Sequence, residues 1–557
     1  MSTRTSDAIS LEVLHNRLEA IVEEMGITML KSAHSPIFYE SKDYSVSLFT
    51  PAGELLAMGQ YIPHHQGGMY AALGAVREIY PPDTMSSGDV YLINDSYLGG
   101  THTADFNVFS PIFVEDELVA YAGCVAHQMD TGGMTPGGYC PSATEVYQEG
   151  IRFPGVKLAD RGKLCDDILR TITRNVRLPD QQRGDLLGQL AALRVAMRAV
   201  PATVARYGAA EFVALCGHLL DLTERRVRAE IAALPDGRYQ ATDLIDHDGL
   251  TDRLYEMRVS IDVVGDRLAI DFTGTDEQAP GFINASLSNT RASTIAALML
   301  FVDPEIPRNH GFIRPLDITV PEGTLLNPRY PAPVGASTTE CGGRVYDLML
   351  TALSNAAPES GFGTWSMCWL GVSFAGIHPR SGQPFIHWVL DGLGTGGGAR
   401  ADADGWNASS VAASNCLIPN VELEEETYPV RFVRRELTTD SGGVGRFRGG
   451  LGLETELAVE VDCAMTVLGS RSEAAPPAGI FGGGPGAAAG VWVRRRDGAH
   501  ETVPIKVTSL ALQAGDHVVM RAPGGGGYGD PTGRDSALIE ADLRAGYVSH
   551  PPSTSGA

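Results

Sequence analysis

Residues 89–127 read DVYLINDSYLGGTHTADFNVFSPIFVEDELVAYAGCVAH, and this stretch decides the fold that we expect. It holds three short apolar runs of the β type, at 89–94, 106–113 and 117–126. A polar loop with two glycines separates the first run from the second, and a short acidic turn separates the second from the third. This order predicts neighbouring strands of one sheet, with polar loops at one edge. If the last two runs pair as a hairpin, their outer ends meet.

Three side chains at that edge have the chemistry of metal ligands. His102 and Asp105 stand three residues apart, and His127 follows the third run, so a hairpin would bring it close to them. Two neutral imidazoles and a carboxylate suit Zn²⁺, Mn²⁺ or Fe²⁺ and leave coordination positions open. Asp43, beside a separate strand-like run, is a candidate fourth ligand. Spacing alone also fits a backbone-bonded histidine and a capping aspartate, because H-x-x-D is less specific than H-E-x-x-H.

On either side of this stretch the apolar periodicity predicts further helices and hairpins. We expect a helix over 11–32, a hairpin from 43–49 and 55–58, helices over 185–234, a hairpin over 259–272 and a helix over 291–302. Pro201 and Gly208 are expected to break the 185–234 run into at least two helices. Gly265-Asp266 gives the second hairpin the Gly-X order of a type II′ turn.

These patterns predict an α+β (mixed α/β), multi-domain fold that is rich in loops and glycine. With 557 residues the chain is too long for one ordinary core. We expect a metal-binding sheet region with a helical end over 1–238, a mixed α/β domain over 239–420, and a β-rich C-terminal region with a glycine-rich tail over 421–557.

Composition excludes several classes of partner. The net charge of -24 repels nucleic acid phosphates and anionic lipid, so neither is an expected partner. No run of 18 or more apolar residues appears, and the first ten residues show no secretory signal, which indicates a cytoplasmic protein. The eight cysteines form no C-x-x-C pair and are expected to be free thiols.

Many segments, in order along the chain, match a known family. Among them are LEVLHNRLEAIVEEMGITMLKSAHSP (11–36), NDSYLGGTHTAD (94–105), AHQMDTGG (126–133), DPEIPRNHGFIRPL (303–316), DSGGVGRFRGGLGLE (440–454) and PGGGGYGDP (523–531). In these segments the chain resembles the B subunit of the hydantoinase/oxoprolinase family, and more distantly the corresponding subunit of acetone carboxylase. The ordered set is more specific than any single segment.

The resemblance implies a function and a partner. In that family a sister A subunit binds ATP with Mg²⁺ and phosphorylates the amide oxygen of a cyclic amide such as hydantoin, 5-oxoproline or a lactam, and water then attacks the former carbonyl carbon. The metal would be held by His102, Asp105 and His127, and Asp43 matches a family aspartate. The expected assembly is an A₂B₂ heterotetramer. This chain has no G-x-x-x-x-G-K-[ST] motif, which agrees with nucleotide binding by the partner.

Three residues are candidates for the group that takes a proton from water: Asp130, Glu149 and His65. Each also has a structural reading, as a turn or surface carboxylate or as a histidine bonded in the core. The chain departs from the family at Gln128, where histidine is common, and at Glu340-Cys-Gly-Gly-Arg344, where E-T-S-Q-R is common. Loss of a histidine at 128 removes a possible proton carrier.

Two other functions fit the sequence. One is a subunit of an ATP-dependent ketone carboxylase, since acetone carboxylase shares the metal position. The other is a non-catalytic structural subunit that stabilises the A partner and binds no metal.

Overall fold

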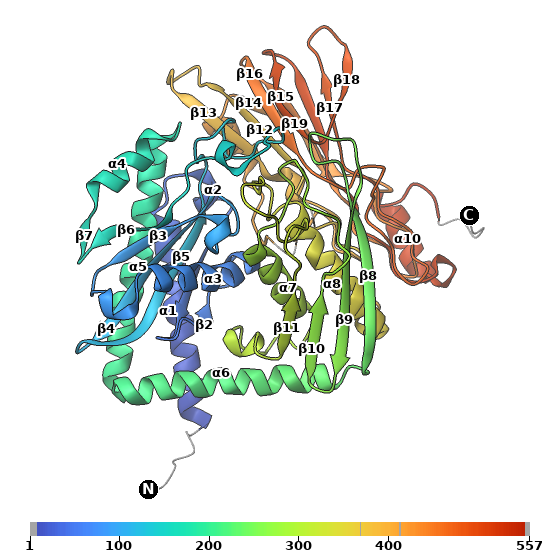
Figure 1. Cartoon of the computed structure of the whole chain (residues 1–557). Helices are drawn as coiled ribbons and strands as arrows, with labels where there is room; N and C mark the ends of the chain where they lie inside the picture. Colours follow the sequence, from blue (N-terminus) through green and yellow to red (C-terminus); the bar gives the residue numbers. More distant parts are fainter. Residues whose placement is uncertain (1–7, 368, 412–413, 552–557) are drawn as a thin grey trace.

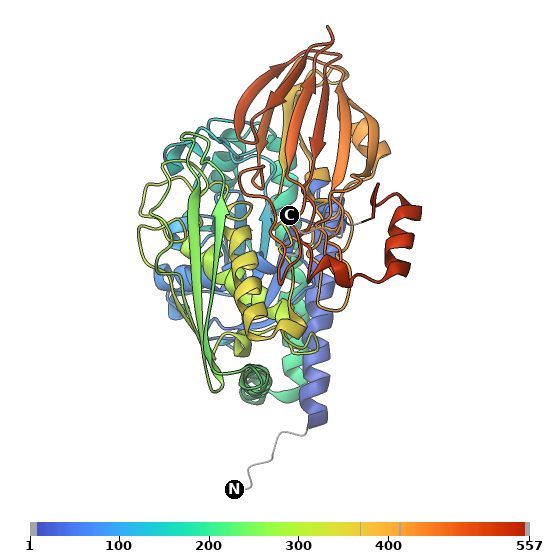
Figure 2. The same cartoon turned by 90° about the vertical axis from the view of Figure 1, so that its right-hand side faces the viewer.

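The structure, a computed structural model, describes residues 8–367, 369–411 and 414–551. It is a mixed α/β fold with four β-sheets in the described part of the chain, and helices pack beside and between them (Figures 1 and 2). The predicted fold class is therefore confirmed. The division at 238 and 420 stays a prediction.

The first sheet has seven antiparallel strands in the order β2-β1-β5-β4-β3-β6-β7. Its strands are β1 (Tyr44–Phe49), β2 (Leu55–Met58), β3 (Val90–Ile93), β4 (Asp105–Val114), β5 (Glu117–His127), β6 (Pro154–Asp160) and β7 (Lys163–Leu164). β4 and β5 form the predicted hairpin, and Asp105 stands directly opposite His127 in its register. The outer ends of the two strands therefore meet, as expected.

Helices cover both faces of this sheet, which is why its central strands are apolar throughout. On one face lie α1 (Ala8–Ser32) and α5 (Pro179–Tyr207), which pack on each other and, for α5, on β4 and β5. On the other face α3 (Pro63–Ile79) buries Met69 and Leu73 against Phe109 and Tyr121. The shorter helices α2 (Pro36–Tyr39) and α4 (Asp166–Arg174) lie beside the sheet.

The helical run after the sheet breaks at one of the two predicted points. α5 continues through Pro201 to Tyr207, so the predicted break at Pro201 is wrong. A proline inside a helix costs about 3 kcal/mol, but burial of the neighbouring Val200 and Val204 holds the helix together. The break at Gly208, with φ +83°, is confirmed, and α6 (Ala209–Ala232) then crosses below both halves of the molecule (Figure 1) and is seen end-on in Figure 2.

The second sheet has the order β11-β10-β9-β8. Its strands are β8 (Gly237–Ile245), β9 (Tyr255–Val264), β10 (Arg267–Asp271) and β11 (Leu316–Thr319). Gly265 has φ +58° in the two-residue turn between β9 and β10, and Asp266 has no positive φ, as a type II′ turn requires. α7 (Leu287–Phe301) packs between α3 and α8 (Cys341–Ala356), and α8 packs on β8, so a layer of helices separates the two sheets (Figure 1).

The C-terminal part holds two further antiparallel sheets, ordered β13-β12-β16-β19 and β14-β15-β20-β17-β18. Their strands are β12 (Gly371–Ile377), β13 (Pro384–Val389), β14 (Val430–Leu437), β15 (Leu453–Val459), β16 (Cys463–Leu468), β17 (Gly490–Arg494), β18 (His500–Val503), β19 (Val507–Leu512) and β20 (His517–Arg521). The helices α9 (Val421–Thr427) and α10 (Ser536–Ala545) flank them. Valines and leucines of both sheets share one hydrophobic cluster.

Glycine-rich segments beside these sheets pack backbone against backbone. The N–H of Gly450 donates to the carbonyl of Gly397 at 2.8 Å, that of Gly525 to Gly450 at 3.0 Å, and that of Gly443 to Gly525 at 2.9 Å. A Cβ at Gly450 would overlap the carbonyl oxygen of Trp406. The glycines of 523–527 are buried in this arrangement, and close backbone approach requires them.

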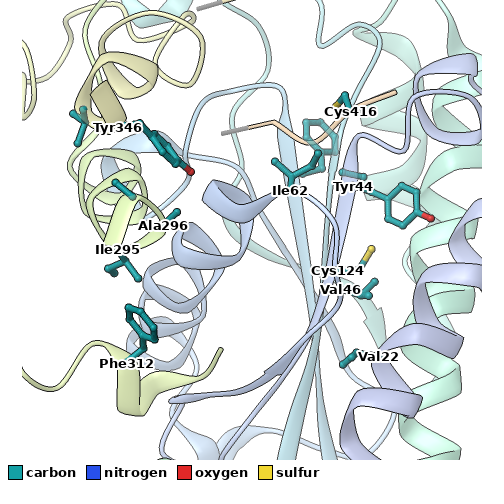
Figure 3. Packing of buried hydrophobic residues seen from close by; sticks show 14 of the residues in the cluster. Val22, Tyr44, Val46, Ile62, Cys124, Ile295, Ala296, Phe312, Tyr346 and Cys416 are labelled. Atoms are coloured by element: carbon teal, nitrogen blue, oxygen red, sulfur yellow. The ribbon is translucent and has the colours of Figure 1, made fainter. Parts of the chain in front are cut away.

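The largest hydrophobic cluster joins the first sheet, its helices, the second sheet and the helix layer. Figure 3 shows the part of it that runs from Ile295 and Ala296 of α7 to Tyr44 and Val46 of β1. The seven cysteines in the described residues are free thiols, as predicted, and Cys368 lies outside those residues. Among the helices of the described part, none is long and apolar enough to cross a membrane.

Candidate metal centre

The β4–β5 hairpin and the loop before it build a buried cluster. Asp105 is the first residue of β4 and His127 the last of β5. His102 comes from the preceding loop, which turns at Gly99 with φ +112°. A Cβ at Gly99 would lie 2.8 Å from the carbonyl oxygen of Ala71, so glycine lets this loop lie against α3.

The three predicted ligands converge on one point. The Nε2 atom of His102 lies 3.0 Å from Oδ1 of Asp105 and 3.2 Å from Nδ1 of His127, and that Nδ1 lies 3.5 Å from the same Oδ1. All three side chains are buried. Ligands about 2.0–2.1 Å from a tetrahedral Zn²⁺ lie roughly 3.4 Å from one another, so this spacing fits a shared ion.

The surroundings of the cluster set its protonation. The Nδ1–H of His102 donates to the carbonyl of Gly335 at 3.1 Å, which leaves the lone pair on Nε2, facing the cluster. Thr101 donates to Oδ2 of Asp105, whereas Oδ1 is buried without a hydrogen-bond donor. Burial alone would raise the pKa of Asp105, but the imidazoles of His102 and His65 hold it well below its ordinary value. A carboxylate oxygen that is buried and ionised beside two imidazoles fits a divalent cation.

His65 and Asp43 extend the cluster toward a cavity. His65, from the start of α3, places Nε2 3.3 Å from Oδ1 of Asp105 and 3.8 Å from Oδ1 of Asp43. Burial lowers the pKa of His65, but the two carboxylates outweigh this and raise it. Asp43 stands beyond the tight group of three, and its side chain is 20% exposed. The structure thus brings Asp43 and His65 to the predicted ligands.

Asp130 and Glu149 are held elsewhere by the backbone. Asp130 accepts the N–H groups of Arg177 and Gly137 at 2.6 and 3.2 Å and pairs with the Arg177 guanidinium at 2.9 Å. Glu149 accepts the N–H groups of Val334 and Gly335 at 3.0 and 2.6 Å. Neither carboxylate lines the cavity beside the cluster.

Gln128 faces the opposite side of the strand from the cluster. It accepts the amide N–H of Gln182 at 2.6 Å and donates to the carbonyl of Ala126 at 2.9 Å and to Gln189 at 3.4 Å. Gln189 in turn donates to the carbonyl of Phe106 at 2.8 Å. This chain of buried amides joins α5 to the end of the hairpin, so the departure at 128 serves packing.

Aromatic side chains that the sequence analysis did not select form a wall of the site. The ring of Tyr139 lies against both histidines of the cluster, with its centroid 5.7 Å from each. Trp369 and Trp388 pack edge-on to Tyr139 at 5.7 and 5.2 Å. Gly137 and Gly138, with φ +88° and +80°, make the turn that positions Tyr139. One sequence signal could have pointed to Tyr139: the glycines and proline of 132–138, which indicate a loop of defined conformation shortly after His127.

A cavity opens from this wall and from the cluster. His102, His127, His65 and Asp43 line its polar end. The remainder of the lining is mostly apolar and comes from segments far apart in the sequence: Ile37, Ile62, Met367, Trp369, Leu390, Leu393 and Val411. A buried donor set of two imidazoles and one carboxylate at the end of an enclosed apolar cavity is the site of a candidate metalloenzyme.

Comparisons with known proteins identify the family. A family model described as hydantoinase B/oxoprolinase matches residues 7–531. The chain is 34% identical over 553 residues to caprolactamase subunit beta of Pseudomonas jessenii, covering 98% of this chain and 94% of the relative. It is 27% identical over 545 residues to 5-oxoprolinase of Dictyostelium discoideum, covering 97% of this chain and 41% of that longer protein.

Solved structures agree. The ATP-dependent caprolactamase from Pseudomonas jessenii superposes with a TM-score of 0.92 at 33% identity, covering 98% of this chain and 95% of that one. Nucleotide-free acetone carboxylase shares the fold, with a TM-score of 0.91 at 21% identity over 98% of this chain and 78% of that one. The chain belongs to the hydantoinase B/oxoprolinase family, as the resemblance predicted. The relatives bear the names of enzymes that act on cyclic amides, the predicted enzyme class.

Proposed function

We propose that this chain is the metal-binding subunit of an ATP-dependent cyclic amide hydrolase. The observation that carries the proposal is the convergence of His102, Asp105 and His127 within 3.5 Å of one another at the end of the cavity. Relatives named as an ATP-dependent caprolactamase and a 5-oxoprolinase supply the class of reaction. The name caprolactamase subunit beta supports a partner subunit, and the name ATP-dependent caprolactamase supports the use of ATP. In our proposal this partner is an A-type subunit that binds the nucleotide, in an A₂B₂ assembly.

In this proposal the overall reaction converts lactam, ATP and two water molecules into the open amino acid, ADP and phosphate. An unactivated amide is a poor electrophile, so the partner first transfers the terminal phosphoryl group of ATP to its oxygen. Water then forms a bond to the former carbonyl carbon, the C–N bond breaks with the ring nitrogen leaving as the amine, and a second water releases phosphate from the resulting acyl phosphate. A divalent ion, when bound, would supply Lewis acidity toward water and toward the substrate oxygen. Zn²⁺, Mn²⁺ and Fe²⁺ all suit two imidazoles and a carboxylate.

The residues of this chain divide the remaining work. His102, Asp105 and His127 hold the ion, and Asp43 completes its surroundings at the cavity end. His65 lines the cavity and accepts the proton from the attacking water. The carboxylate of Asp105, at hydrogen-bond distance from His65, stabilises the imidazolium that forms. Glu149 acts as a positioning residue, because it holds Gly335, whose carbonyl orients His102. Asp130 holds the loop that carries Tyr139.

Ring opening by the co-purified complex with its partner tests the proposal. The complex is expected to release one amino acid and one phosphate per lactam opened, only with ATP present. Ring opening without ATP, or ATP hydrolysis without ring opening of any cyclic amide, contradicts it. Incorporation of labelled bicarbonate into product would instead assign a carboxylase.

A further inference from the structure

The cavity beside the cluster has an unusual charge composition for a site that would bind an acidic substrate. Among the described residues that line it, none is a lysine or an arginine. The three residues outside the described ranges that are nearest in sequence, at 368, 412 and 413, are Cys, Ala and Ala. This chain therefore offers no lysine or arginine to a substrate carboxylate at that place, and His65 already faces two carboxylates of the chain itself, Asp105 at 3.3 Å and Asp43 at 3.8 Å.

The charged side chains that line the cavity disfavour a carboxylate on the substrate. Asp105 and Asp43 already place two carboxyl groups 3.3 and 3.8 Å from Nε2 of His65. Two carboxylates balance the charge of a divalent ion, so little net positive charge remains for an anionic ligand. An ionised carboxylate that enters an apolar site loses its hydration, and without a partner in the site nothing offsets this free-energy cost.

The polar groups of the cavity wall suit an uncharged amide instead. The indole N–H of Trp369 is buried without an acceptor and belongs to a residue of the lining, so it is available to a carbonyl oxygen. Thr338 and Thr339 add hydroxyl groups near the cluster, which can accept an amide N–H. Ile62, Leu393 and Val411 face the rest of a ligand with aliphatic surface.

We propose that this cavity selects an uncharged lactam with an aliphatic ring and rejects rings that carry a carboxylate, such as 5-oxoproline. This inference rests on the proposed function, since it names the substrate class of the same site. Trp369 donates to the lactam oxygen, and Ile62, Leu393 and Val411 cover the methylene groups. Apolar surface in contact with the ring then favours binding in proportion to the area removed from water.

A matched pair of substrates tests the selectivity. 2-Pyrrolidinone and 5-oxoproline have the same five-membered ring and differ only in the carboxylate. With the full complex and ATP, kcat/KM for 2-pyrrolidinone is expected to exceed that for 5-oxoproline by at least about 100-fold, the penalty of an unpaired buried charge. Excess 5-oxoproline is also expected to leave the opening of caprolactam uninhibited. Equal kcat/KM values, or a preference for 5-oxoproline, overturn the inference and leave the proposed function intact.

Failure of the proposed function looks different. It would appear as no ATP-dependent opening of 2-pyrrolidinone, caprolactam or 5-oxoproline by an assembled complex.

A variant of the cavity wall gives a second measurement of the selectivity. Val411→Arg places a cation in the wall and is expected to raise the kcat/KM ratio of 5-oxoproline to 2-pyrrolidinone by at least about tenfold, whereas the neutral control Val411→Met is not. A folded Val411→Arg complex with an unchanged ratio counts against the inference.

Discussion

At the scale of single residues, hydrogen bonds to the backbone distinguish the three candidate proton acceptors, Asp130, Glu149 and His65. Both oxygens of Glu149 accept backbone N–H groups, and so do both of Asp130, and neither carboxylate lines the cavity. His65 keeps an edge on the cavity and touches Asp105. Residue type and neighbourhood in the sequence suggested all three as proton acceptors, and the hydrogen bonds distinguish them.

The buried carboxyl of Glu149 predicts a pH dependence of stability. Burial raises its pKa to about 8 against the hydrogen bonds from Val334 and Gly335. The folded chain therefore holds this proton where the unfolded chain has released it, so stability falls as the pH rises from about 4.5 to about 8, by up to about 1.4 kcal/mol per pH unit. Glu149→Gln should flatten the pH dependence of chemical unfolding in that window. An unchanged slope would show that Glu149 does not carry it.

Sequence reasoning predicted that His102, Asp105 and His127 come together, but it missed the aromatic side chains that cover them. His102, Asp105 and His127 are residue types that commonly bind metals, and pairing of the hairpin strands placed Asp105 opposite His127. Tyr139, Trp369 and Trp388 are ordinary core residue types, and they meet only because the loop after β5 folds back under the C-terminal sheets. Contacts between segments more than 200 residues apart leave no periodic trace in a sequence.

At the scale of secondary-structure elements, hairpins and amphipathic helices were predictable because their signals are local. Alternation and turn residues gave β4, β5, β9 and β10. The turn sets the register of the β9–β10 hairpin, whereas in β4–β5 an irregularity between Ile112 and Phe113 shifts the register that its turn begins. The predicted break at Pro201 failed because burial on both sides of α5 overrides the preference of one residue. Local preference decides an element only where packing does not.

A buried ion pair joins α8 to the C-terminal sheets. Lys506 lies 3.2 Å from Glu340, directly before the departure from the family pattern at 341–343, and both side chains are fully buried. Lys506→Met leaves the Glu340 carboxylate without its cation and is expected to lower the free energy of unfolding by about 3–5 kcal/mol. Denaturant titration measures it. The double variant with Glu340→Gln should recover part of the loss, and a Lys506→Met protein as stable as the wild type would show that the pair contributes nothing.

The glycine segments give a second prediction about elements. Gly450→Ala would press a methyl group onto the carbonyl of Trp406 and is expected to destabilise the chain by at least about 2 kcal/mol. Gly217, within α6, has open space around its missing Cβ, so Gly217→Ala should stabilise by about 0.5–1 kcal/mol. Thermal unfolding of the two variants compares them directly. The same sign of change for both would refute close backbone packing as the cause.

At the scale of the whole molecule, two stretches that are far apart in the sequence, 37–139 and 338–416, line the cavity. The first sheet supplies the donor cluster, the segment before α8 supplies Thr338, and the C-terminal part supplies Leu393 and Val411. The largest hydrophobic cluster also crosses the predicted boundary near 238. Composition and length indicated several domains, but how such parts close around one cavity depends on long-range packing.

The division of labour between subunits gives a prediction at the same scale. The purified chain alone is expected to bind metal yet to open no lactam, with or without ATP, because our proposal assigns activation of the amide to the partner. Adding the partner subunit should restore ATP-dependent ring opening. Turnover by the isolated chain would place both halves of the reaction on this polypeptide.

The central claim is that His102, Asp105 and His127 bind a divalent ion, and elemental analysis of the purified complex tests it most directly. The wild-type chain and the control His310→Ala, a half-buried histidine remote in sequence, should each contain about one Zn²⁺, Mn²⁺ or Fe²⁺ per chain. His102→Ala should lose the ion and ring opening while keeping its circular dichroism spectrum. A folded His102→Ala protein with the full metal content of the wild type would contradict the account.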